Sequence, residues 1–377
     1  MFQRALRVAC FSGCVFISVS CLACLWDRDT LAMERQRFPT VLELISGKFL
    51  RHSPDFYRWR IARTRELLKS GGKPELYDDL AVAHEKLGDT DSAIRVTLEK
   101  ESRHPGLYST YANLGTFYIH AGDFASGLKE IDKALAINPD AHFGREIYQK
   151  LLVEYLLSKN EGSEISLPVS PKPGSLFEPC GFGAFLREQP ETEETKEAKQ
   201  ILLKKAIKGV LGMMKFGNYD SPVLLEALGD LLLSQGYETD AKRLAARAYL
   251  KASYEVADPK VSDAYRAKAK ECLNMQTRKG GSNTPLQLEE LEAQFKMELK
   301  DAGLWYKAVI DDEQKWISSG ADVQAEFERK YYQPPAAGAG YRRSGPSIPL
   351  IVGSICVVLV FCFFVLKSKL HTDDAQV

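Results

Sequence analysis

Residues of the same type recur in this chain at a spacing of 34 positions, and this register constrains the fold more than any other feature. The pairs at this spacing include Leu80 and Leu114, Gly88 and Gly122, Pro105 and Pro139, and Tyr77 and Tyr111. Such a period, with small residues at fixed places, is the sequence sign of an array of paired helices. The register therefore predicts an all-α fold and argues against an enzyme.

Within this register the residues resemble the tetratricopeptide repeat, which implies a helical solenoid. The second unit offers the family's signature residues as Tyr111, Leu114, Gly115, Tyr118, Gly122, Gly127, Ala134 and Pro139. The first unit offers Tyr77, Leu80, Ala81, His84, Gly88, Ala93, Lys100 and Pro105. The departures are His84, where the family has Tyr, and Gly127 and Lys100, where it has Ala. None of these departures breaks the helix pairing.

The resemblance also implies close packing between the two helices of each unit. A small residue on the first helix faces a small residue on the second, as Ala81 does with Ala93 and Gly115 with Gly127. A bulky side chain at Gly115 is expected to overpack the pair, at a cost of about 1–3 kcal/mol.

The third unit is interrupted by a loop. Its first helix is expected after His142, but Lys159 to Thr195 is rich in proline and carries an acidic tract, which is loop composition. The residues that restore the register in a fourth unit are Leu225, Leu228, Gly229, Leu232, Gly236, Ala241 and Ala248. The expected repeats lie near 74–107, 108–141, 142–221 with an insertion at 159–195, and 222–255. A long loop adds only about 0.6 kcal/mol of closure entropy per doubling of its length, so the array stays continuous.

Helical segments are expected on both sides of the array, which spans 74–256. An N-terminal helical cap is predicted at 26–73, where Ser53 and Pro54 form a helix start. A C-terminal cap and a long amphipathic helix are predicted at 257–332. The apolar stripe of this helix is Leu288, Leu291, Phe295, Leu299, Ala302, Tyr306 and Val309. The stripe either packs back on the array or forms a coiled-coil or partner-helix surface.

The N-terminal segment 1–25 is interpreted as a signal peptide or signal anchor. Arg4 and Arg7 precede an uncharged run that is rich in small residues. The residues before Cys24 resemble the end of a bacterial lipoprotein signal, in which the cysteine becomes lipidated. Cleavage after Ala23 without lipidation, or retention as an anchor, are the alternatives.

A second apolar run, at 348–366, carries no charge and has the length that a bilayer core of about 30 Å requires. We predict a transmembrane helix there. It follows a flexible Pro-, Gly- and Ala-rich tether at 333–347 and precedes a short tail at 367–377.

Basic residues next to the apolar runs predict the orientation. Lys367 and Lys369 follow the second run directly, as two arginines precede the first. The positive-inside rule then places both ends in the cytoplasm and the bulk of the chain outside it. Arg342 and Arg343, on the other flank of the second run, weaken this argument. The absence of an Asn-x-Ser/Thr sequon favours a bacterial source and hence the periplasm.

Motifs that carry chemistry are absent from the sequence. No His-Glu-x-x-His segment and no Gly-rich loop ending in Gly-Lys-Ser/Thr occurs, and no two histidines stand three or four residues apart. The 50 basic and 50 acidic side chains cancel, which argues against a nucleic-acid partner. We expect no catalytic residue, cofactor, metal or small-molecule substrate. Cys180 and Cys272 form either one disulfide or two buried thiols.

The resemblance places the binding surface on the first helix of each unit. The candidate partner-binding groove consists of Asp78, Glu85, Thr116, His120, Glu146, Lys150, Glu226 and Asp230. The Lys and Asn that let some family members clamp a terminal carboxylate are missing, and an acidic groove favours basic or polar ligands. The alternative is that these side chains are merely solvated.

Taken together, these patterns predict a membrane-anchored, extracytoplasmic tetratricopeptide scaffold that binds proteins or peptides. A tail-anchored adaptor that faces the cytosol is the alternative. An enzyme built on the repeat scaffold is the remote third hypothesis.

Overall fold

The computed structural model describes residues 25–34, 36–159, 165–173, 179, 181–189, 195–235, 241–274 and 287–332. Within these ranges the regular structure consists of fifteen α-helices and one short 3-10 helix, η1, and contains no strand. The prediction of an all-α fold is therefore confirmed.

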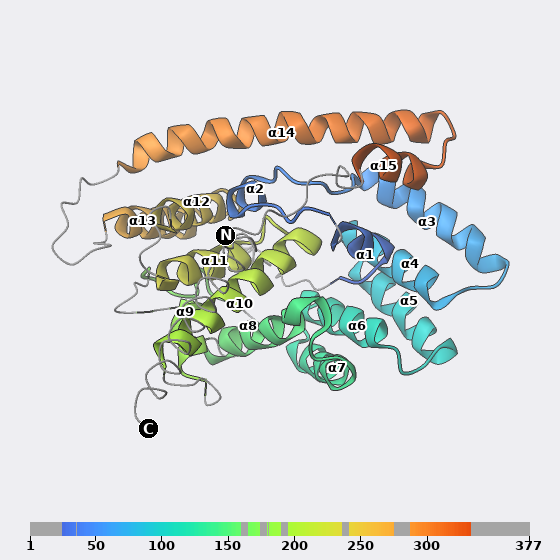
Figure 1. The fold of residues 1–377 in the computed structure, drawn as a ribbon, viewed down its shortest axis with the longest axis horizontal. Helices are drawn as coiled ribbons and strands as arrows, with labels where there is room; N and C mark the ends of the chain where they lie inside the picture. Colours follow the sequence, from blue (N-terminus) through green and yellow to red (C-terminus); the bar gives the residue numbers. More distant parts are fainter. Residues whose placement is uncertain are drawn as a thin grey trace, which may run out of the picture. The chain divides into compact units, whose positions relative to one another are not determined.

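Two helical hairpins follow the 34-residue register. In the first, α4 (Pro74–Lys86) packs on α5 (Thr90–Arg103). In the second, α6 (Tyr108–His120) packs on α7 (Phe124–Ile137). Each helix of the second hairpin begins 34 residues after its counterpart in the first. The hairpins lie side by side, because α6 also packs against α5 and α4 (Figure 1).

The two hairpin turns share one local design. Gly88 and Gly122 adopt left-handed conformations, with φ of 79° and 82°, which glycine reaches without a steric penalty. The residues that follow, Asp89 and Asp123, each accept a hydrogen bond from the backbone N–H three residues on and thereby cap the next helix. A repeated Gly-Asp pair thus ends one helix and starts the next.

The second hairpin has the close helix approach that its glycines predict. A Cβ atom added to Gly115 would lie 2.7 Å from Cγ1 of Ile131 and 3.1 Å from the carbonyl oxygen of Gly127. A Cβ atom added to Gly127 would lie 3.0 Å from the carbonyl oxygen of Gly115. Backbone therefore faces backbone at this crossing, and only glycine fits on both sides.

After η1 (Ala141–Gly144) come α8 (Arg145–Lys159) and, beyond the short helix α9 (Gly181–Arg187), the helices α10 (Lys196–Phe216), α11 (Pro222–Gln235), α12 (Ala241–Tyr254) and α13 (Pro259–Asn274). Helices α8 and α10 pack together although the insertion separates them in the sequence. Each later helix then packs on the one before it. The contact between α8 and α10 thus joins two helices that the 34-residue register predicts to form one interrupted unit.

The described parts of the insertion pack against the same helices. The short helix α9 (Gly181–Arg187) contacts α8, α10 and α11. Its Phe182 and Leu186 are fully buried and belong to the main hydrophobic core, together with Leu228 and Tyr249. Burial of such side chains stabilises the fold by about 1.5–3 kcal/mol each. The insertion is therefore in part a core element.

The N-terminal part forms α1 (Arg28–Glu34), α2 (Val41–Ser46) and α3 (Pro54–Lys69). The predicted start of α3 is confirmed, since the Ser53 hydroxyl accepts a hydrogen bond from the N–H of Phe56 and Pro54 is the first helical residue. Helix α3 packs on α4, and α2 packs on α10 and α12.

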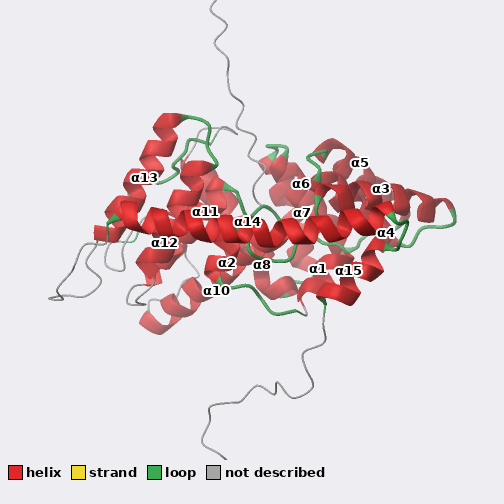
Figure 2. Ribbon diagram, turned by 90° about the horizontal axis from the view of Figure 1, so that it is seen from above, coloured by secondary structure: helices red, strands yellow, loops and turns green. Residues whose placement is uncertain are grey.

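The long helix α14 (Leu288–Ser318) packs back on the rest of the fold. It runs along one side of the molecule and contacts α2, α3, α12 and α13 before it turns into α15 (Val323–Tyr331) (Figures 1 and 2). Leu291, Phe295 and Val309 of its predicted apolar stripe are buried. Of the two alternatives for this stripe, the described structure therefore has packing on the body.

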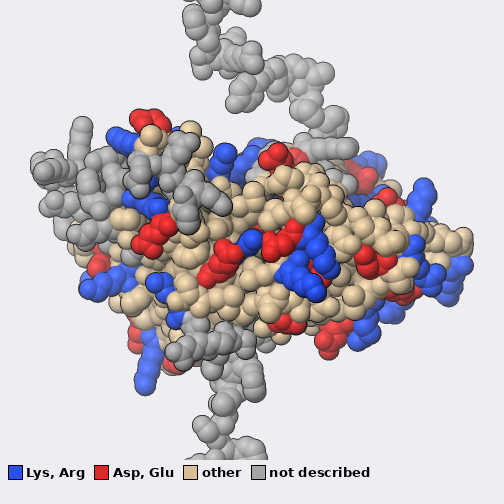
Figure 3. Space-filling model, turned by 90° about the horizontal axis from the view of Figure 1, so that it is seen from below, with Lys and Arg blue, Asp and Glu red and all other residues tan. Residues whose placement is uncertain are grey.

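Charged side chains of both signs lie interspersed on the face drawn in Figure 3. No helix within the described residues combines the length and the apolar character that crossing a bilayer requires. The predicted signal segment 1–25 and Cys24, the tether at 333–347, the transmembrane segment 348–366 and the tail at 367–377 lie outside the described residues, apart from Leu25.

Candidate functional site

The candidate groove residues on the first hairpin are engaged in internal contacts. Asp78 is buried, and the ammonium of Lys100 donates to both of its carboxylate oxygens at 2.7 Å. The Asn113 amide donates to the same carboxylate at 3.1 Å. Burial raises the pKa of Asp78 to about 6, against the opposing effect of Lys100. The lysine that departs from the repeat signature thus has a structural role.

The other candidates on α4, α6 and α8 are mostly buried as well. Glu85 and His120 pair with each other, with 2.5 Å between Oε1 and Nδ1. The Thr116 hydroxyl is buried and accepts from the side chain of Gln149 at 3.2 Å. Glu146 is also buried.

Lys150 lies nearer the surface than these side chains. It is partly exposed and pairs with Asp132 at 2.6 Å.

The last two candidates, Glu226 and Asp230, are buried on α11 beside Lys268 of α13. The Lys268 ammonium lies 2.8 Å from Oε1 of Glu226 and 2.9 Å from Oδ1 of Asp230. The hydroxyl of Tyr265 donates to Glu226 at 2.8 Å, and that of Tyr249 donates to Asp230 at 2.7 Å. We call Glu226, Asp230 and Lys268 the α11 network.

The chain's own insertion covers the α11 network through its backbone. The N–H groups of Val169 and Ser170 donate to Glu226 at 3.0 and 2.8 Å, and the N–H of Phe182 donates to Asp230 at 3.4 Å. The carbonyl of Ser170 accepts from Lys268 at 3.0 Å. These side chains are thus occupied by polypeptide backbone, and they are neither solvated nor open to a ligand.

The approach of the insertion to α11 depends on a glycine. Gly181 has a positive φ of 60°, and a Cβ atom added to it would lie 1.9 Å from Oδ2 of Asp230. No other residue fits this position without moving the carboxylate or the loop. Burial raises the pKa of Asp230 to about 6, with Lys268 opposing and the charge of Glu226 adding to the shift.

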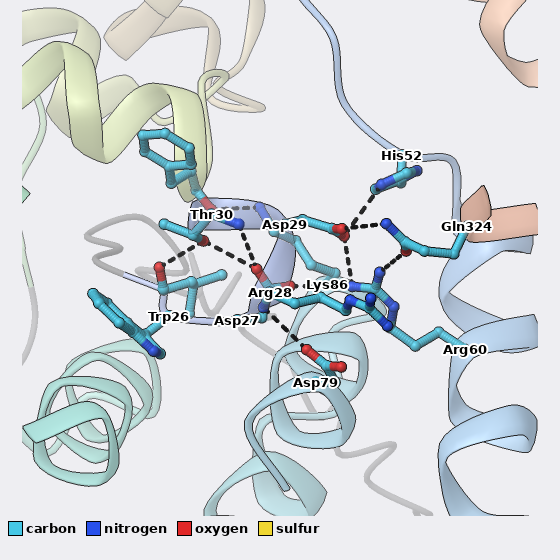
Figure 4. A network of polar contacts seen from close by, with 12 residues as sticks. Trp26, Asp27, Arg28, Asp29, Thr30, His52, Arg60, Asp79, Lys86 and Gln324 are labelled. Carbon is cyan, nitrogen blue, oxygen red and sulfur yellow. Dashed lines mark hydrogen bonds and ion pairs between the residues drawn. The ribbon is translucent and has the colours of Figure 1, made fainter. Parts of the chain in front are cut away.

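A second buried network, which the sequence did not indicate, ties both ends of the described chain together. Its members are Asp27 just before α1, Asp29 in the first turn of α1, His52 before α3, Arg60 of α3, Asp79 of α4, Glu313 of α14 and Gln324 of α15. We call it the terminal network. Figure 4 shows Asp29 at its centre, facing Arg60, His52 and Gln324. Its members come from six segments, so no local motif marks it.

Asp29 holds the terminal network together. Its carboxylate lies 2.6 Å from Nη1 of Arg60 and 3.2 Å from Nε2 of His52, and it accepts from Gln324 at 3.0 Å. Nδ1 of His52 lies 2.6 Å from Glu313. Because both ring nitrogens of His52 face carboxylates, the ring is placed to carry two N–H donors and a positive charge.

The pKa values in the terminal network diverge according to the partners. Burial favours the neutral form of Asp29, but Arg60 and His52 outweigh it and hold the pKa of Asp29 well below its usual range. Burial and the charge of Asp29 raise the pKa of Asp27. Burial also raises the pKa of Asp79 to about 7, against the effect of Arg60. Two carboxyls of this network therefore tend to retain protons.

The described residues contain no group of three or more His, Cys, Asp or Glu side chains that is arranged to hold a metal ion. Cys272 is a buried thiol whose pKa is raised by burial, and Cys180 lies outside the described residues. The two networks consist of charge pairs that are closed to solvent.

No protein-family model, no curated protein and no solved structure matches this chain. The arrangement of its own residues is therefore the basis for any functional conclusion.

Proposed function

We propose that this protein is a membrane-anchored, extracytoplasmic scaffold of the tetratricopeptide type, which binds extended polypeptide segments on the first helices of its units. The observation that carries the proposal is the contact between α11 and the insertion. Glu226 accepts hydrogen bonds from two backbone N–H groups of a non-helical segment, and Asp230 accepts one from the start of α9. This surface therefore has the chemistry that holds a peptide main chain.

The 34-residue register supports the proposal. The hairpins α4–α5 and α6–α7 repeat one turn design, and Asp78 and Glu226 occupy equivalent places on their helices by this register. Each of these two carboxylates is held by a buried lysine, Lys100 or Lys268. The lysines stand at different register positions, on α5 and α13, so the feature that the two units share is a buried carboxylate paired with a lysine of another helix.

The peptide-binding part of the proposal is tested with the insertion itself. In the full chain, residues 165–187 are replaced by a Gly-Ser linker of equal length, and a labelled synthetic peptide of sequence 165–187 is added. We expect saturable one-to-one binding by fluorescence anisotropy, because the peptide restores the donors that Glu226 and Asp230 have lost. Asp230→Asn in this background should weaken binding about tenfold, since hydrogen bonds to charged groups contribute about 1.5–3 kcal/mol.

Two controls distinguish specific from non-specific binding of the peptide. A scrambled peptide should not bind, and Asp132→Asn, which removes a carboxylate of a partly exposed ion pair, should leave the affinity unchanged. If the linker variant keeps the far-UV circular dichroism of the parent and does not bind the peptide, the α11 surface is not a peptide-binding surface.

The orientation in the membrane is tested separately. A reporter fused at Gly280, between α13 and α14, should be active in the extracytoplasmic compartment. A cytosolic signal from this fusion would instead favour the tail-anchored adaptor that faces the cytosol.

A further inference from the structure

A cavity of about 290 Å³ lies between the connections on either side of α2, the last turn of α10, and the pair α14–α15. Its apolar walls are Met33, Phe49, Leu50, Trp305, Tyr331 and Tyr332. Pockets for drug-sized ligands have volumes of about 300–1,000 Å³. This cavity therefore fits one ring with a short substituent and is too small for a peptide.

Lys215, in the last turn of α10, lines this cavity and is 8% exposed. Its ammonium donates to the carbonyl oxygen of Met33 at 3.0 Å. It also lies 5.1 Å and 4.7 Å from the ring centroids of Phe38 and Phe216. A lysine has three N–H donors, and among the described residues one carbonyl oxygen accepts from it while two aromatic rings face it. No described carboxylate forms an ion pair with Lys215.

The carboxylates around the cavity already have cationic partners. These ion pairs are Arg37 with Glu43, Lys48 with Asp301, and Arg145 with Glu34. Among the described basic residues that line the cavity, Lys215 is therefore the one that forms no ion pair with a described carboxylate. Burial lowers the pKa of Lys215 to about 8, with Glu34 opposing and Arg145 adding to the shift. The amine is still mainly charged at pH 7, and a buried charge without an ionic partner is costly.

We propose that this cavity binds a small monocarboxylate with a flat apolar body. The carboxylate accepts the remaining N–H donors of Lys215, and the ring lies against Trp305 and Tyr331. One cation in an otherwise neutralised, aromatic-walled cavity selects a single negative charge attached to an apolar group. This site is separate from the α11 surface, and it departs from the expectation of a chain that takes only protein partners.

The test compares a carboxylate with its neutral amide. The full chain in non-ionic micelles is titrated with 4-fluorobenzoate and, separately, with 4-fluorobenzamide, and binding is followed by fluorine NMR. We expect the acid to bind at least about tenfold more tightly than the amide, since a hydrogen bond to a charged group contributes about 1.5–3 kcal/mol. Equal affinities, or no binding of the acid at millimolar concentration, would overturn the proposal.

Three variants test whether Lys215 causes the preference for the acid over the amide. Lys215→Met should remove the difference between acid and amide, and Lys215→Arg should restore most of it. Lys300→Met removes an exposed lysine of α14 that does not line the cavity, and it should change neither affinity. An unchanged preference in Lys215→Met would show that another group binds the acid. The amide comparison on the parent chain decides the proposal even if a variant fails to fold.

Discussion

The two buried networks of this protein satisfy their carboxylates in different ways. In the α11 network, one lysine faces two carboxylates, and neutral tyrosine hydroxyls and backbone N–H groups supply the other donors. In the terminal network, the described members include four carboxylates, whose observed ion pairs are made with two cationic side chains, Arg60 and His52. The first is built to hold one segment of backbone, whereas the second joins segments from both ends of the chain.

The two networks should respond differently to the loss of a hydrogen-bond donor or a cation. Neutral donors satisfy a carboxylate locally, and the loss of one leaves the others in place. The cations of the terminal network are shared among several acids, so the loss of one affects all of them. We therefore expect the terminal network to be the more sensitive to mutation and the α11 network to be the more sensitive to displacement of the insertion.

The largest effect is expected from removing the shared cation of each network. Arg60→Met and Lys268→Met should each lower the free energy of unfolding by about 3–5 kcal/mol, because each removes a cation that offsets two buried carboxylates. The loss should be greater for Arg60, which lies within ion-pair distance of both Asp27 and Asp29. Urea denaturation of the full chain followed by circular dichroism measures both.

Neutralising the acids provides the control for this pair of variants. Adding Glu226→Gln and Asp230→Asn to Lys268→Met should recover much of the lost stability, since no buried charge then remains unpaired. A greater loss from Lys268→Met than from Arg60→Met would reverse the comparison between the two networks.

The pH dependence of stability tests the excess of acids in both networks. The pKa values of Asp79 and Asp230 are raised to about 7 and about 6. The folded state therefore keeps protons that the unfolded state has released above about pH 4. The free energy of unfolding should fall as pH rises from about 5 to about 7, by up to about 1.4 kcal/mol per pH unit for each proton retained.

The pKa shifts of other groups set the limits of this pH range. The raised pKa of His52 acts in the same direction, and its contribution is lost as the pH rises further. The lowered pKa values of Asp29 and of Glu292, which pairs on α14 with Arg266 of α13, act oppositely and remove stability below about pH 4. Asp79→Asn should flatten the slope near pH 7, whereas Asp230→Asn should flatten it near pH 6. A slope near pH 7 that Asp79→Asn leaves unchanged would assign it to a different group.

The contact between the insertion and α11 can be tested by a substitution that adds one methyl group to the insertion. Gly181→Ala places a Cβ atom 1.9 Å from Oδ2 of Asp230, so the loop or the carboxylate must move. We expect a loss of about 2–3 kcal/mol from combined overpacking and backbone strain. Thermal unfolding and proteolysis of residues 165–189 measure the effect.

Gly88→Ala is the matched control for this variant. Gly88 has a similar positive φ of 79°, but no atom lies within 4 Å of an added Cβ. It should therefore cost only the backbone strain, about 1 kcal/mol. Equal losses in the two variants would mean that contact with Asp230 does not constrain the insertion.

The sequence predicted those features that depend on neighbours in the register. The recurrence of Gly88 and Gly122 marks a conformation that is local to each turn, and the close approach of Gly115 to Gly127 depends on one helix crossing. Each involves residues within a single hairpin. For this reason a repeated pattern was sufficient to predict them.

The contacts around the candidate groove could not be predicted, because the partners of its residues are distant in the sequence. The backbone that covers Glu226 lies 57 and 56 residues away and has no side-chain signature. The terminal network was missed altogether, since His52 and Glu313 are 261 residues apart. A binding role for the groove residues stays a prediction, and at α11 it requires the insertion to leave.

The smallest effect is expected at an exposed ion pair, which sets the baseline for both networks. Lys307 pairs with Asp311 one turn away at 2.7 Å on α14, and both side chains are exposed. Lys307→Ala should change the free energy of unfolding by only about 0.3–0.5 kcal/mol, and less at high salt, because solvent already stabilises both charges. Lys268 carries the same ammonium group but has a buried position. If Lys268→Met lowers the free energy of unfolding about ten times as much as Lys307→Ala, burial determines how strongly an ion pair stabilises this protein. The mere presence of an ion pair would not explain such a ratio.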